Sequence, residues 1–110
     1  MIIFSKIEDN ILILKIIENN NLNSLLIKIK ITKNTLNNFR NLYHNLHKNT
    51  NHSFIENDMF IEFKDNVIKF SNDIFEYSLT KNNELVDMFD KIITNLMIND
   101  LDRDSPKNKD

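Results

Sequence analysis

Apolar side chains return every three or four positions along residues 83–98, which is the clearest helical pattern in the chain. The stripe is formed by Leu85, Phe89, Ile92 and Leu96, and it is widened by Val86, Ile93 and Met97. Thr80 or Asn82 can cap the start of this helix, because a side-chain oxygen at that position accepts a free backbone N–H. A stripe of this width is typical of a helix that buries one side, so its residues are expected in the core.

A second helix is predicted over residues 34–48, where apolar side chains again share one face. Thr32 or Asn34 can cap its first turn. The apolar face consists of Leu36, Phe39, Leu42, Tyr43 and Leu46.

Residues 2–8 and 11–17 are rich in isoleucine, which favours strands over helices. The dipeptide Asp9-Asn10 separates them. This spacing predicts a hairpin in which asparagine takes the positive-φ turn position that glycine normally fills.

A polar loop over 19–24 precedes a third predicted strand, over 25–32. In that strand isoleucine alternates with the lysines Lys28 and Lys30. Strict alternation indicates one buried face and one face in contact with water.

Strand patterns return in the second half of the chain as a meander over 59–65, 67–71 and 74–80. Asp65-Asn66 and Ser71-Asn72-Asp73 supply the turns, and Phe54 and Ile55 can begin the first of these strands earlier.

The predicted order is therefore β-β-β-α-β-β-β-α, an α+β fold. Short links between consecutive strands favour antiparallel pairing. We expect one antiparallel sheet with both helices packed on one face, which is a two-layer sandwich. Residues 1–99 are expected to form a single domain, and the charged segment 100–110 a flexible tail.

The chain of 110 residues contains no glycine and no cysteine, while asparagine, isoleucine and lysine, whose codons are AT-rich, are abundant. Without glycine, phosphate-binding loops, dinucleotide fingerprints and nucleophile elbows are very hard to build. Without cysteine there are no disulfides and no cysteine-ligated zinc. No signal peptide and no membrane-spanning run is evident, so we expect an intracellular, cytoplasmic protein without membrane contact and without a cofactor.

Charge is distributed unevenly around a formal net charge of −2. Between residues 19 and 55 there is no Asp or Glu, and this stretch is the candidate binding surface for an acidic partner. The candidate partner-binding residues are Lys28, Lys30, Lys33, Arg40, His44 and Lys48. A solvated face whose charges complement the acidic second helix explains the same pattern and is the preferred interpretation.

Candidate reaction chemistry is sparse. His44, His47 and His52 could in principle converge on a metal, but no acidic residue lies nearby to orient them, so surface histidines are expected instead. Glu62 and Glu76 lie within predicted strands, where exposed carboxylates are ordinary. We therefore predict no catalytic, cofactor-binding or metal-binding residues and no enzymatic activity. A hydrolase or metal-dependent enzyme is the least favoured alternative.

The stretch from Leu36 to Leu96 resembles small bacterial immunity proteins of contact-dependent toxin systems. The similarity lies in a helix like TLNNFRNLYHNL, a strand meander, and a closing phrase like FEYSLTKNNELVDMFDKIITNL. The glycine and tryptophan usual in that group are missing here, and no site residue is carried over. The resemblance implies a non-enzymatic, protein-binding role, either immunity-like or in assembly.

We therefore expect a small non-catalytic domain that binds another protein or its own copy. The alternative is an accessory nucleic-acid-binding protein that uses the basic stretch 28–48.

Overall fold

The computed structural model describes residues 1–18 and 24–103, with no side chains described beyond Asp100. The α+β class and the predicted succession of three strands, a helix, a strand meander and a second helix are confirmed, and one strand, β4, is added before the meander. The elements are β1 (Ile2–Glu8), β2 (Ile11–Ile17), β3 (Ser24–Lys30), α1 (Thr35–Lys48), β4 (His52–Glu56), β5 (Met59–Lys64), β6 (Val67–Ser71), β7 (Glu76–Thr80) and α2 (Asn83–Arg103).

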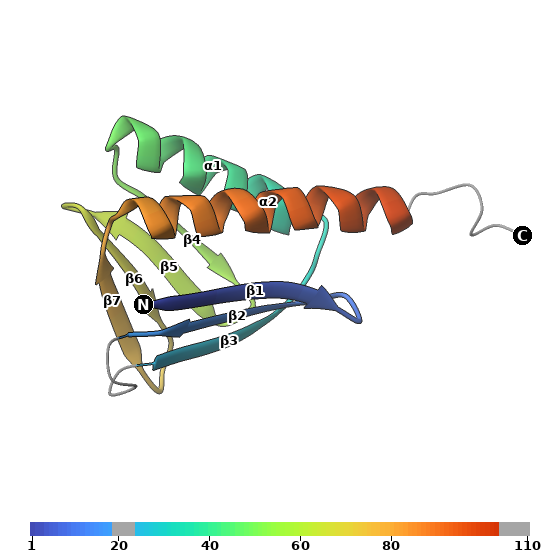
Figure 1. Ribbon diagram of the computed structural model, residues 1–110, viewed down its shortest axis with the longest axis horizontal. Coiled ribbons are helices and arrows are strands. Elements are labelled where there is room, and N and C mark those ends of the chain that lie inside the picture. The colour runs from blue at the N-terminus through green and yellow to red at the C-terminus, as the bar shows by residue number, and fades with distance from the viewer. Residues whose placement is uncertain (19–23, 104–110) are drawn as a thin grey trace, which may run out of the picture.

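The described strands form two antiparallel sheets, so the expectation of one sheet is wrong on this point. Sheet A has the order β1-β2-β3, and sheet B has the order β4-β5-β6-β7 (Figure 1). Helix α1 lies between β3 and β4 in the chain, so no hairpin joins the two sheets. The Asn57 side chain accepts a hydrogen bond from the Lys30 N–H (3.0 Å) and donates one to the Lys30 carbonyl (3.3 Å). An amide therefore occupies part of the β3 edge where a further strand would pair.

The turns predicted at Asp9-Asn10 and Asp65-Asn66 are present, and the positive φ expected at Asp9-Asn10 is confirmed. Asp9 and Asn10 have φ values of 53° and 62°, and Asp65 and Asn66 have φ values of 52° and 68°. Asn57 and Asn49 also adopt positive φ, the latter directly after α1. Asparagine and aspartate tolerate this region better than other residues with a Cβ, so they replace glycine at each of these turns.

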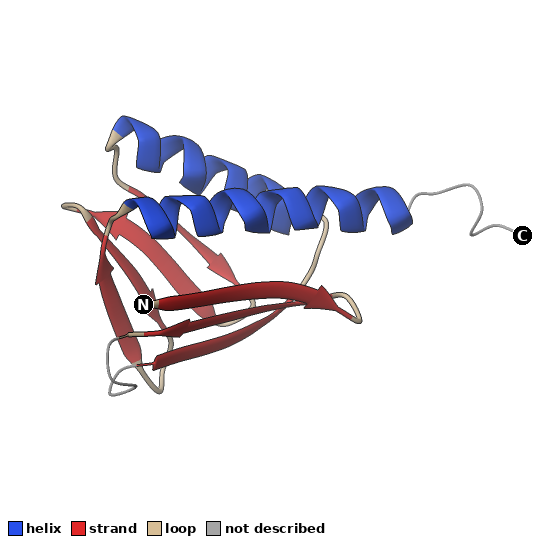
Figure 2. Ribbon diagram, in the orientation of Figure 1, coloured by secondary structure: helices blue, strands red, loops and turns tan. Residues whose placement is uncertain are grey.

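The two helices lie side by side on the same side of the sheets (Figure 2). Helix α2 packs along β1 of sheet A, whereas α1 contacts β4 of sheet B. The helix pair and the inner faces of the two sheets therefore enclose one hydrophobic core.

Helix α2 supplies the centre of that core. Its predicted stripe is confirmed, because Leu85, Phe89, Ile92 and Leu96 are each 0% exposed. The Phe89 ring stacks on Phe39 of α1 and on Phe70 of sheet B, with centroid distances of 6.1 and 6.5 Å.

The margins of this helix differ from the prediction. Met97 is 41% exposed, and Met88, which was not assigned to the stripe, is buried. The helix continues to Arg103, five residues beyond the expected end at Ile98. Residues 104–110 of the expected tail, and 19–23 of the predicted loop, lie outside the described residues.

The helix starts differ in how they are capped. Asn82 caps α2, since its Oδ1 accepts the Leu85 N–H at 2.9 Å. Asn34 makes no such bond at α1. There the buried Glu56 carboxylate accepts hydrogen bonds from the Thr35 hydroxyl (3.3 Å) and the Asn38 amide (2.9 Å). A carboxylate beside a helix N-terminus is stabilised by the helix dipole.

Candidate functional site

The outer face of sheet A, turned away from the helices, mixes lysine with apolar side chains. The strand register aligns them in cross-strand rows. One row is Phe4–Lys15–Leu26, and the next is Lys6–Ile13–Lys28. We call this surface the A face. It consists of Ile2, Phe4, Lys6, Glu8, Ile11, Ile13, Lys15, Ile17, Ser24, Leu26, Lys28 and Lys30.

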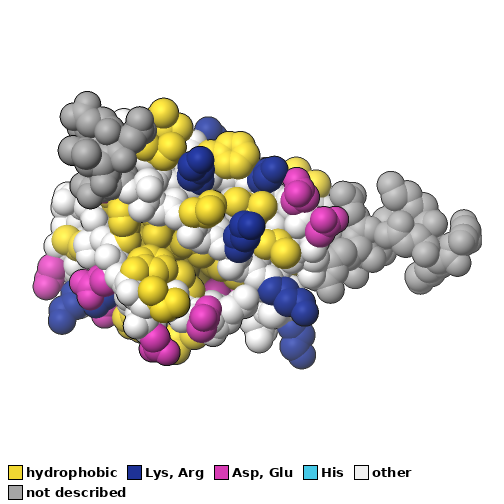
Figure 3. Space-filling view, turned by 90° about the horizontal axis from the view of Figure 1, so that it is seen from below, with side chains coloured by type: hydrophobic (Ala, Val, Ile, Leu, Met, Phe, Trp, Pro, Cys, Tyr) yellow, Lys and Arg dark blue, Asp and Glu magenta, His cyan; other side chains and the backbone are white. Residues whose placement is uncertain are grey.

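Large apolar side chains on the A face are open to solvent. Ile2 is 63% exposed, Leu26 is 58% exposed and Phe4 is 47% exposed. The space-filling view from below shows lysines set among hydrophobic side chains on this part of the surface (Figure 3). Single exposed apolar residues are common, but three of them on one small sheet face form a patch with the composition of a binding surface.

The electrostatics of the A face are one-sided. It holds four lysines against one glutamate. Lys6 is bound to Glu8 at 3.0 Å, and the Lys6 ammonium also lies 6.0 Å from the centre of the Phe4 ring. Among the described residues, Lys15, Lys28 and Lys30 form no ion pair. These three charges are therefore available to an anionic partner.

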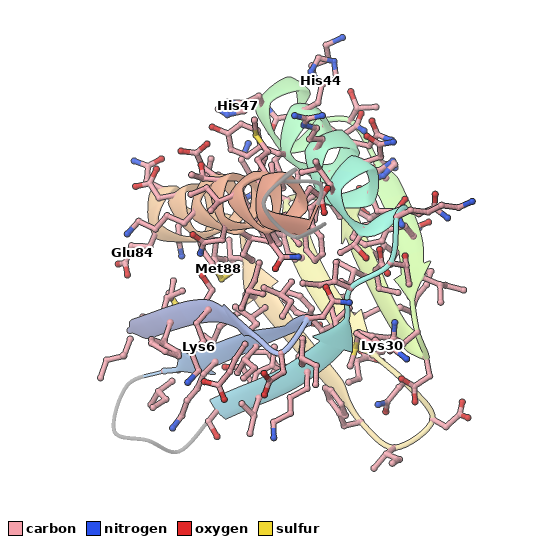
Figure 4. All side chains as sticks on the ribbon, turned by 90° about the vertical axis from the view of Figure 1, so that its right-hand side faces the viewer. Lys6, Lys30, His44, His47, Glu84 and Met88 are labelled. Carbon is pink, nitrogen blue, oxygen red and sulfur yellow. The ribbon has the colours of Figure 1, made fainter. Side chains whose placement is uncertain are left out.

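The predicted partner-binding residues are divided between two surfaces. Lys28 and Lys30 lie on the A face, whereas Arg40, His44 and Lys48 form a row along the exposed side of α1. Lys33, just before α1, is also exposed. Figure 4 shows His44 at the top of the molecule, on α1, and Lys30 well below it, on β3. The basic stretch 28–48 is thus continuous in sequence but not in space.

Of the A face, the sequence predicted only Lys28 and Lys30 as partner-binding residues. Ile2, Phe4, Lys6 and Lys15 were not assigned to a site, because the isoleucine-rich hairpin gives no strict alternation from which an outer face can be read. The turn at Asp9-Asn10 contained the missing signal. It sets the register between β1 and β2, which places Lys15 beside Phe4.

The other candidate groups do not assemble into a reactive centre within the described part of the chain. His44 and His47 are exposed on α1, while His52 lies in β4 with its ring 6.0 Å from that of Phe54. No group of three described metal-ligating side chains converges. Glu62 lies 3.6 Å from Lys69, and the register places Glu76 beside Ser71 rather than beside Glu62.

Tyr77 and Glu18 make the one polar side-chain contact that joins β7 to the end of β2 among the described residues. The Tyr77 hydroxyl donates a hydrogen bond to the Glu18 carboxylate at 2.5 Å. Burial, with a further contribution from Glu18, raises the pKa of the Tyr77 phenol well above its usual range. The contact is therefore a structural link between sheets rather than a proton-transfer pair at neutral pH.

The comparisons with known proteins place no external constraint on function. No family model, curated protein or solved structure matches the chain. None of the described helices combines the length and the apolar character needed to cross a membrane. Any functional conclusion rests on the A face itself.

Proposed function

We propose that the protein is a non-catalytic domain that binds an acidic partner protein through the A face. The observation that carries the proposal is the combination of three lysines free of ion pairs with the exposed Ile2, Phe4 and Leu26. Burying the apolar groups supplies affinity, and the lysines select a negatively charged surface and accelerate encounter.

The apolar residues favour a protein over a nucleic acid. Faces that bind single-stranded nucleic acid stack bases on aromatic rings. On the A face the only aromatic ring is Phe4, and Ile2 and Leu26 offer no flat surface for a base. Aliphatic side chains surrounded by cations instead complement an acidic protein surface with an apolar centre. The sequence resemblance to immunity proteins agrees with a protein-binding role.

The first experiment captures partners from cells that encode the protein and compares two charge reversals. Lys28→Glu changes the A face, while Lys64→Glu changes an exposed strand lysine on the outer face of sheet B. Each captured candidate is then purified, and its binding is measured by calorimetry at several salt concentrations.

Support requires an acidic protein whose affinity falls at least about tenfold with Lys28→Glu, weakens with salt, and is unchanged by Lys64→Glu. Equal affinity for both variants would overturn the proposal. Salt-sensitive binding of purified DNA or RNA that depends on Arg40 and Lys48, with no protein partner, would replace it with the nucleic-acid alternative.

A further inference from the structure

Strand β1 has one edge whose backbone groups are unpaired. Glu8 and Ile11 are the last paired residues of the β1–β2 hairpin, and the two-residue turn Asp9-Asn10 joins them. Residues that flank a two-residue turn form a hydrogen-bonded pair. Counting back by twos, Ile3, Ser5 and Ile7 direct their N–H and C=O groups away from β2. Within the described residues no hydrogen bond reaches these outward groups.

This free edge opens into a groove beside α2. A hollow of about 620 Å³ is bounded by Ile3 and Ser5 on the strand side and by Asp87 and Lys91 on the helix side. A second hollow, of about 290 Å³, continues from Ser5 to Ile7. Figure 4 shows Glu84 and Met88 on the α2 side of this space and Lys6 on the opposite, outer side of β1.

Strand β1 lacks three of the features that keep edge strands apart, although it carries Lys6 and Glu8 on its outer face and α2 packs along it. Proteins protect such edges with proline, bulges or inward-pointing charges. In β1 the register is continuous, and the inward positions are Ile3, Ser5 and Ile7. At the opposite edge of sheet A, the Asn57 side chain blocks part of β3.

We propose that β1 pairs antiparallel with β1 of a second copy, about a two-fold axis at Ser5. Ser5 then lies opposite the partner's Ser5, and Ile3 lies opposite the partner's Ile7. All three outward-facing residues become hydrogen-bonded, and each pair exchanges two N–H···O bonds. The two copies of sheet A join into one six-stranded sheet.

Side chains and charges agree with this register. Phe4 lies opposite the partner's Lys6, which repeats across the axis the contact that Lys6 makes with Phe4 within one chain. The charges of Lys6 and Glu8 cancel within each strand, and no like charges lie directly opposite each other. Moving the register by one step of two residues either shortens the overlap or places Lys6 opposite the partner's Lys6.

Exposed apolar residues lie on both sides of the proposed β1–β1 interface. Ile2 and Phe4 lie on the outer face, and Ile98 of α2, which is 53% exposed, lines the groove near Ile7. Pairing removes part of this apolar area from water, as a self-complementary two-fold interface requires. The inference uses the backbone edge of β1 rather than the free lysines, and it shares Ile2 and Phe4 with the proposed partner-binding surface.

A single-cysteine variant tests the axis directly, because the chain has no cysteine of its own. In a hydrogen-bonded antiparallel pair the Cα atoms lie about 5.5 Å apart. That distance lies within the range of disulfide geometry. Ser5→Cys is expected to form a disulfide-linked dimer on mild oxidation. The matched control is Ser78→Cys, an exposed serine in the edge strand β7, which is expected to remain monomeric.

A disrupting variant provides the second readout. Ser5→Lys places two like charges opposite each other across the axis, whereas Ser78→Lys does not. Light scattering after size exclusion should give twice the monomer mass for the wild type and Ser78→Lys, and the monomer mass for Ser5→Lys. Circular dichroism verifies that each variant is folded.

A wild type that sediments as a monomer up to submillimolar concentration overturns the inference. So does a Ser5→Cys variant that cross-links no faster than Ser78→Cys. A dimer that persists in folded Ser5→Lys assigns self-association to another surface. Lys28→Glu should leave the dimer intact, so this result is separable from the test of partner binding.

Discussion

The two sheets bury the same kind of side chain but present different surfaces to solvent. Inward, sheet A contributes Leu14 and Ile27, and sheet B contributes Ile61 and Phe70, all nearly inaccessible. Outward, sheet B balances two lysines with two glutamates, and Glu62 and Lys69 lie 3.6 Å apart. Apart from Ile55, its outer face has no strongly exposed apolar residue.

The outer face of sheet A combines excess lysine with exposed Ile2, Phe4 and Leu26. Folding does not require this difference, because each sheet already buries most of its inner face. The contrast between a cationic, apolar surface on sheet A and a neutral one on sheet B supports the proposal that a partner binds the A face.

The largest expected loss of stability follows from removing the Phe89 ring, which links α2 to α1 and to sheet B. Phe89→Ala removes a ring that is 0% exposed and stacked between Phe39 and Phe70. It should lower the free energy of unfolding by about 3–5 kcal/mol. Urea denaturation followed by circular dichroism measures this loss. A loss below about 1 kcal/mol would mean that α2 does not close a core shared by the two sheets.

A smaller loss of stability is expected when a buried carboxylate is removed, and almost none when an exposed one is removed. Glu56→Ala deprives the Thr35 hydroxyl and the Asn38 amide of their acceptor at the start of α1. The expected destabilisation is about 1–3 kcal/mol, because the remaining donors lose their buried partner. Glu76→Ala, at an exposed carboxylate of sheet B, is the matched control and should change stability little. Similar melting temperatures for the two variants would contradict a stabilising role for the hydrogen bonds that Glu56 accepts.

The Tyr77–Glu18 contact tests the link between the sheets. Tyr77→Phe should cost about 1 kcal/mol through loss of one hydrogen bond. The folded-state pKa of Tyr77 is raised above its unfolded value, so the contribution is fully present below that unfolded value. It is lost as pH rises through the folded pKa.

Ultraviolet absorbance follows this ionisation. In a Tyr43→Phe background Tyr77 is the remaining tyrosine of two, and its phenolate should form only at strongly alkaline pH. Phenolate formation at the ordinary tyrosine pKa in the folded protein would show that the contact is absent in solution.

The smallest change in stability is expected from charge reversals on the outer faces of the two sheets. Lys28→Glu and Lys64→Glu each change an exposed lysine without an ion pair among the described residues. Both should alter the free energy of unfolding by less than about 0.5 kcal/mol. Thermal melting measures both variants. A difference between them of more than about 0.5 kcal/mol in the free energy of unfolding would show that the lysines of sheet A are needed for folding. That result would remove the reason to assign these lysines to a partner.

Local patterns predicted local structure well. The helical stripe at Leu85, Phe89, Ile92 and Leu96 and the turns at Asp9-Asn10 and Asp65-Asn66 were all identifiable from spacing alone. The turn that separates β4 from β5 was missed, since Asn57-Asp58 was not recognised as a break in a strand pattern. The margins of α2 were also missed, because helix ends depend on neighbours that a periodic pattern does not include.

The candidate site was only partly predictable for the same reason. Alternation with isoleucine placed Lys28 and Lys30 on a wet face, and the structure confirms that both are exposed. Their neighbours Phe4 and Lys15 come from strands aligned by hairpin register, and Arg40 and His44 are carried away by α1. Grouping residues by nearness along the chain therefore joined the lysines of β3 to the basic residues of α1, which lie apart. It also overlooked the neighbours of these lysines on the A face.

By itself the sequence determined the type of each main element, the turns without glycine and the residues of the central helix stripe. These follow from steric limits on φ and from burying one face of a periodic pattern, both of which act over a few residues. Only the tertiary structure decided that the strands divide into two sheets and that the A face collects side chains from three strands. Such choices depend on contacts between distant segments, whose free energies no local pattern contains.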